Sequence, residues 1–219
     1  MKIRFILVCL VLIIVSFSLN SLAYDHKAVR SYISYRIKYI HSVAYNTNID
    51  LSKERVQEYT ESIIYWSDYY SRELNVNIDP LLVTAIIETE TNFVSRADYD
   101  NGDSIGVASM KINTAKWIAK QLGVDYNKWS ILNATDLGIR FAVYYLGLAF
   151  DKYRGNLYQA ILSYNQGLSG VSPDVDQLYD NYLFKVLGRY KYYQKRLAMR
   201  NSTAATAVKY FNYKFNQFY

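Results

Sequence analysis

The scarcity of helix breakers constrains this chain more than any other feature of its sequence. Its 219 residues include only 9 glycines and 2 prolines. These two residue types disfavour helix interiors most strongly and are abundant in many-turned β-sandwiches. No sustained alternation of apolar and polar residues indicates a strand. The sequence therefore predicts an all-α protein, and with 51% hydrophobic residues it is too apolar to be disordered.

The first 23 residues have the form of a signal peptide. Lys2 and Arg4 form a short basic start, and residues 5–17 are almost entirely apolar. Ser21-Leu22-Ala23 then places small residues at positions −3 and −1 of a cleavage site. The apolar run is shorter than the roughly 20 residues of a spanning helix, so we expect cleavage rather than an uncleaved N-terminal anchor. The protein would then be exported to the periplasm or cell envelope.

Charge is distributed unevenly along the chain. The formal net charge is +6, and cleavage would remove two basic residues and leave 23 − 19 = +4. Residues 24–180 carry 15 Lys and Arg against 19 Asp and Glu, whereas residues 181–219 carry 8 and no acid. A basic C-terminal segment suits a polyanion, so we expect peripheral contact with an anionic envelope. Export makes nucleic acid the least suitable partner.

The helical pattern predicts four parts. Residues 1–23 are the signal peptide, 24–75 an N-terminal helical segment that packs on the main domain, 76–200 that main domain, and 201–219 an aromatic and basic tail. This tail either packs on the body as a terminal helix or presents a surface for sugars or a membrane interface. Helices are expected over residues 26–44, 53–74, 81–93, 114–122, 135–153, 157–164 and 176–199.

The helix after Asp79 and Pro80 carries the best candidate for chemistry. An acceptor at the cap and proline at the first helical position mark its start. At about 100° per residue, Glu90 lies in line with apolar residues such as Ile86, whereas Glu88 is expected to be an ordinary solvated carboxylate. Desolvation and the helix dipole both disfavour ionisation of Glu90, which suits a general acid. The alternative is a glutamate at the edge of the core, paired with a Lys or Arg.

Further motifs follow this helix at characteristic spacings. In chain order they are Asp79-Pro80, Glu90-Thr91-Asn92-Phe93, Gly106-Val107-Ala108-Ser109, Thr114-Ala115, Tyr145-Leu146, Ser163-Tyr164-Asn165-Gln166-Gly167 and Tyr182-Leu183. In their order and spacing, they resemble the catalytic domain of family 1 lytic transglycosylases, the soluble-lytic-transglycosylase type related to goose-type lysozyme. The resemblance covers roughly half of the chain and implies a lysozyme-like helical domain.

The resemblance implies cleavage of peptidoglycan glycan strands between N-acetylmuramic acid (MurNAc) and N-acetylglucosamine (GlcNAc). Glu90 would protonate the glycosidic oxygen and then, as a carboxylate, accept the proton of the C6 hydroxyl of MurNAc. That hydroxyl would close onto C1 to give a 1,6-anhydro product. This mechanism needs one protein carboxylate, and we expect neither a cofactor nor a metal, since His26 and His41 have no Cys or acid cluster near them.

Six further residues receive substrate-binding or supporting roles from the resemblance. Tyr164 and Asn165 would line the cleft, and Tyr182 would reach the Glu90 carboxyl through its hydroxyl. Each tyrosine could instead be simple core packing in a chain with 24 tyrosines.

Three of these residues call for separate comment. Thr91 keeps the hydroxyl of a family serine, and Gly106 would allow the backbone to approach the sugar. Ser109 stands where the family has glutamine, or Lys111 does if the alignment shifts by two residues, and the loss of that amide removes a sugar contact worth about 1 kcal/mol.

Two other functions remain open at this point. The protein could be a hydrolytic muramidase, because Asp98, Asp100 and Asp103 supply acids on the loop after Glu90. It could also be a catalytically silent peptidoglycan-binding or scaffold protein.

Overall fold

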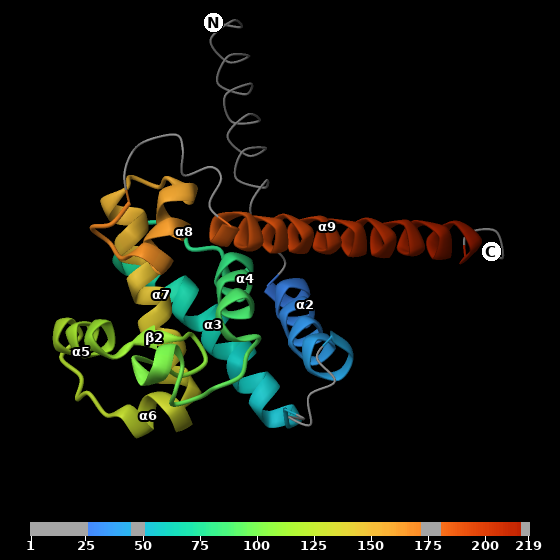
Figure 1. The fold of residues 1–219 in the computed structure, drawn as a ribbon. Coiled ribbons are helices and arrows are strands. Elements are labelled where there is room, and N and C mark those ends of the chain that lie inside the picture. Colours follow the sequence, from blue (N-terminus) through green and yellow to red (C-terminus); the bar gives the residue numbers. More distant parts are fainter. Residues whose placement is uncertain (1–25, 45–50, 172–180, 216–219) are drawn as a thin grey trace, which may run out of the picture.

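The computed structural model describes residues 26–44, 51–171 and 181–215 of the chain (Figure 1). The expected signal peptide, residues 1–23, lies outside these described residues, as does most of the loop expected around Pro173. Of the aromatic and basic tail, residues 201–215 are described as helical backbone.

Helices make up most of the described chain, which confirms the all-α fold class. The helices are α2 (His26–Tyr39), α3 (Lys53–Glu73), α4 (Pro80–Thr91), α5 (Ile112–Gln121), α6 (Lys128–Asn133), α7 (Thr135–Lys152), α8 (Leu157–Gln166) and α9 (Asn181–Phe215). Two short turns are the π-helical η1 (Ile40–Ala44) and the 3-10 helical η2 (Asp100–Gly102). Two antiparallel strands, β1 (Ser104–Ile105) and β2 (Met110–Lys111), complete the elements.

Local structure differs from the sequence expectation in three places. Helix α6 was not expected, because its six residues bury only Ile131 and show no helical period. Its start is set by Asn127, whose side chain accepts from the Trp129 backbone N–H at 2.9 Å. Strands β1 and β2 are two residues each, too short to show alternation. Helix α9 continues past the boundary expected at residue 200.

Helix α7 forms the centre of the body and packs along α3 (Figure 1). Its Gly147 permits this approach, because a Cβ there would lie 2.6 Å from the Leu74 side chain. Helix α9 packs against α4, also contacts α2, and extends beyond the body (Figure 1). No helix of the described ranges is long and apolar enough to cross a membrane.

Helix α4 is an internal helix that ends abruptly after Glu90. Asp79 caps it by accepting from the Leu81 backbone N–H at 2.8 Å, and Pro80 opens its first turn. At its other end Asn92 and Phe93 both have positive φ, 53° and 63°, so the chain leaves the helix axis there. This turn sends the following loop back across the helix end that carries Glu90.

The expectation for Glu88 is wrong. This residue is 4% exposed and contacts Arg36 of α2 and Arg189 of α9. The face of α4 that looks polar from its own sequence is covered by those two helices. Periodicity within one helix carries no information about charges brought to it from distant segments.

Candidate active site

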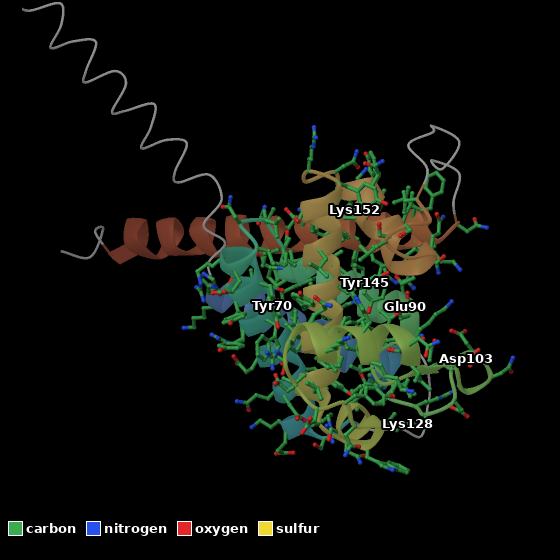
Figure 2. The ribbon with its side chains drawn as sticks, turned by 90° about the vertical axis from the view of Figure 1, so that its left-hand side faces the viewer. Tyr70, Glu90, Asp103, Lys128, Tyr145 and Lys152 are labelled. Carbon is green, nitrogen blue, oxygen red and sulfur yellow. The ribbon has the colours of Figure 1, made fainter. Side chains whose placement is uncertain are left out.

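A pocket of about 140 Å³ lies at the end of α4, where five segments converge. Glu90 comes from α4, Thr114 from α5, Tyr145 from α7 and Tyr164 from α8, while the loop after α4 supplies Asp100. Figure 2 shows Glu90 beside Tyr145 among the side chains of this region. The full lining is Glu90, Asp100, Ser104, Ser109, Met110, Lys111, Thr114, Tyr145, Tyr164, Asn165, Gln166 and Gly167.

Glu90 is the acid of this pocket. Burial raises the pKa of its carboxyl from 4.5 to about 7, and the negative charge of Asp100 acts in the same direction. The Tyr182 hydroxyl donates to Oε1 at 2.6 Å and opposes this rise, because it stabilises the carboxylate. A group balanced near neutral pH can both give and take a proton under one set of conditions.

Tyr164 and Tyr145 form one wall of the pocket. Their rings meet edge to face, with centroids 6.0 Å apart. The Tyr164 hydroxyl donates to the Ala108 carbonyl at 3.0 Å, and burial raises the pKa of Tyr164 well above its usual value of 10.0. The Tyr145 hydroxyl accepts from the Leu168 backbone N–H at 3.0 Å. These bonds join α7, α8 and the loop between α4 and α5 beside the pocket.

The loop between α4 and α5 supplies the other polar part of the lining. Asp100 accepts through Oδ2 from the Ser104 hydroxyl at 2.7 Å, which orients an otherwise exposed carboxylate. Ser109 follows a turn in which its N–H donates to the Gly106 carbonyl at 3.2 Å, and its φ is 46°. Ser109 and Asn165 both line the pocket.

Three predicted residues are absent from the pocket lining: Tyr182, which still reaches Glu90, and Thr91 and Gly106. Thr91 is buried, and its hydroxyl contacts the Val107 carbonyl, which fastens the loop to the last turn of α4. Gly106 has a φ of 79°, and a Cβ there would lie 3.1 Å from the Ile131 side chain. Backbone conformation and the close packing of α6 therefore account for this glycine without a sugar contact.

Tyr145 belongs to the Tyr145-Leu146 motif, but it was given no role at the site, because a place in a motif does not show which side chains reach the pocket. Asp100 was one of three loop acids with equal standing, and Lys111 entered only as a shifted alignment to the family glutamine. Distances across the fold were needed to select them. Among the described residues, no group of three or more His, Cys, Asp or Glu side chains is placed to hold a metal.

A comparison with known protein families identifies the family of this domain. A family model described as Transglycosylase SLT domain matches residues 70–182, more than half of the chain. No curated protein shows a significant match. The chain therefore belongs to the SLT transglycosylase domain family, a family of lytic transglycosylases that act on peptidoglycan. The matched region begins within α3, contains the whole pocket lining and ends at Tyr182.

Proposed function

We propose that this protein is an exported lytic transglycosylase that cleaves the MurNAc-β-1,4-GlcNAc bond and leaves a 1,6-anhydro-MurNAc end. Glu90 acts as the general acid and then as the general base. The observation that carries the proposal is a carboxyl with a pKa of about 7, held by Tyr182 and lining a pocket within the family-matched region.

In the first step Glu90 donates its proton to the glycosidic oxygen, and the bond from C1 of MurNAc to that oxygen breaks. GlcNAc leaves as an alcohol, and positive charge develops at C1 and the ring oxygen. The Glu90 carboxylate forms next to this charge, and the Tyr182 hydroxyl stabilises it through the 2.6 Å hydrogen bond. The negative charge of Asp100 in the pocket favours the same cationic ring.

In the second step the C6 hydroxyl of the same ring attacks C1. Its proton passes to Glu90, which returns to the protonated state with no uptake of water. The two steps require opposite protonation states of the Glu90 carboxyl. A pKa near 7 makes both protonation states accessible at neutral pH.

Hydrolysis is the second candidate because Asp100 lies in the same pocket as Glu90. A second carboxylate could activate water or trap C1, as in muramidases. The two reactions give different products, since the anhydro sugar is lighter than the hydrolysed one by one water. Mass spectrometry of the digest identifies which reaction occurs, and loss of lysis in Glu90→Gln excludes a silent binding protein.

Export and envelope contact belong to the same proposal. Cleavage after Ala23 predicts a mature chain that begins at Tyr24, which N-terminal sequencing of the protein from the envelope fraction tests. The 8 basic residues and no acids after residue 180 support peripheral contact with an anionic envelope. Loss of sedimentation with anionic vesicles at high salt, together with retained sedimentation at low salt, tests that contact.

A further inference from the structure

Glu88, two residues before Glu90, is the most heavily bonded carboxylate of the described residues. It is 4% exposed, and its two oxygens accept from three side chains. Arg36 binds it in a bidentate manner, with Nε at 2.9 Å from Oε2 and Nη2 at 2.6 Å from Oε1. Arg189 Nε lies 3.0 Å from Oε1, and the Tyr193 hydroxyl donates to Oε2.

These donors come from two other helices that pack against α4. Arg36 belongs to α2, while Arg189 and Tyr193 belong to α9 and lie one turn apart. The Arg36 guanidinium also lies 5.4 Å from the centre of the Tyr193 ring, so α2 and α9 contact each other over the carboxylate. One side chain of α4 therefore joins three helices.

Stability alone is a poor explanation for this arrangement. Burying the Glu88 carboxylate beside two partly buried guanidinium groups carries a desolvation cost, and well-packed apolar side chains often stabilise a core as much or more. A bidentate network of charge-assisted hydrogen bonds supplies a fixed orientation and register between the helices that it joins. One contact that depends on the register of α9 against α4 is the hydrogen bond from Tyr182 to Glu90.

Tyr182 lies on the same face of α9 as the two residues that bind Glu88. It precedes Arg189 by seven positions and Tyr193 by eleven, which at 100° per residue places all three within about 20° of one face of α9. Along α9, Arg189, which binds Glu88, lies two helical turns, about 10 Å, after Tyr182, which binds Glu90. A sliding or rolling movement of α9 on α4 would thus move the Tyr182 hydroxyl away from the acid.

We propose that Glu88, Arg36, Arg189 and Tyr193 form a positioning clamp that holds α9 in the register at which the Tyr182 hydroxyl reaches Glu90. The inference rests on the proposed function for the catalytic role of Glu90, while the clamp itself rests on geometry. It extends the catalytic unit beyond residues 70–182 to α2 and to the part of α9 after Tyr182. Glu88 is a positioning residue and touches no substrate.

The test uses the full chain and compares Glu88→Gln with Tyr182→Phe and with the double variant. Glu61→Gln is the matched control, because it removes a carboxylate that pairs with another arginine of α2, Arg30, at 2.8 Å on the surface. The readouts are kcat and KM on peptidoglycan, the unfolding midpoint, and the pKa of Glu90 from ¹³C-NMR of labelled glutamate. Both single variants leave unchanged the other titratable groups that face Glu90: Asp100, Lys111, Tyr145 and Tyr164.

The clamp predicts that folded Glu88→Gln raises the pKa of Glu90, as Tyr182→Phe does. Loss of the Glu88 negative charge by itself would lower that pKa, so the sign separates the two causes. We expect kcat of Glu88→Gln to fall about tenfold with little change in KM. The double variant should match Tyr182→Phe, because both changes remove the same hydrogen bond from Tyr182 to Glu90. Glu61→Gln should leave all readouts near those of the wild type.

The proposal is overturned if folded Glu88→Gln keeps the wild-type pKa of Glu90 or lowers it, or if its effects add to those of Tyr182→Phe. Should Glu88→Gln fail to fold, Arg189→Lys and Tyr193→Phe carry the same comparison with smaller changes. An absence of lysis by the wild type would reject the proposed function and leave the NMR comparison as the test of the clamp.

Discussion

The hydroxyl of Tyr182 lies 2.6 Å from Oε1 of Glu90, and the two residues are separated by 92 positions in the sequence. The bond joins the first turn of α9 to the last turn of α4. This hydrogen bond lowers the pKa of Glu90, whereas burial raises it. The packing of α9 therefore affects the chemistry of the pocket.

Replacing Tyr182 by Phe should slow the reaction and shift its pH dependence. Without the hydroxyl the Glu90 carboxylate loses a charge-assisted hydrogen bond, so we expect kcat to fall about ten- to a hundredfold. The pKa of Glu90 should rise, which moves the alkaline limb of the pH–rate profile to higher pH. Tyr190→Phe is the control. Tyr190 lies on the same helix as Tyr182, but its hydroxyl donates to Asp79 at 2.6 Å and not to Glu90, so this variant should leave the pH–rate profile in place.

Replacing Asp100 by Asn should act in the opposite direction on acidity. The negative charge of Asp100 raises the pKa of Glu90, so its removal should move the pH–rate profile to lower pH. The 1,6-anhydro product should persist, with a reduced rate. Complete loss of activity in this variant, with a hydrolysed product from the wild type, would favour the muramidase reaction instead.

Removing the catalytic carboxyl should stabilise the protein at neutral and alkaline pH. Folding raises the pKa of Glu90 from 4.5 to about 7, so the folded state binds more protons than the unfolded state between these values. Stability from this group is therefore present below pH 4.5 and lost as the pH rises through 7. Relative to wild type, Glu90→Gln should gain about 1–3 kcal/mol of unfolding free energy at pH 8 and little at pH 4. Urea unfolding at the two pH values measures this, and an equal effect at both would contradict it.

Gly106 should be required for the fold of the loop and not for sugar contact. In Gly106→Ala the strained φ of 79° costs about 1–2 kcal/mol, and the clash with Ile131 adds to it. Gly123→Ala is the matched control, because its φ is 61° but no atom lies within 4 Å of the added Cβ. Urea unfolding should show a larger loss for Gly106→Ala. Equal losses would show that packing against α6 contributes nothing.

Features encoded locally were predicted well from the sequence. Asp79 and Pro80 mark the start of α4 through their own cap geometry, and the line of apolar residues correctly indicated that Glu90 faces a desolvated environment. The resemblance added the Tyr182 contact, which no periodicity could supply across 92 positions.

Features that depend on distant charges could not be predicted in this way. Glu88 looks solvated from its helix, but its partners Arg36 and Arg189 lie 52 and 101 positions away. Asp98, Asp100 and Asp103 look alike in sequence, and only the turn after Phe93 and the β1–β2 hairpin bring Asp100 to the pocket. Helix α6 is set by the Asn127 cap and a single buried residue, a signal too short for any period.

The most direct test of the account is mass spectrometry of purified peptidoglycan digested by the wild-type protein and by Glu90→Gln. The account predicts 1,6-anhydro-MurNAc ends from the wild type and no glycan cleavage by the folded variant. Reducing MurNAc ends from the wild type, or anhydro products released at an undiminished rate by Glu90→Gln, would contradict it.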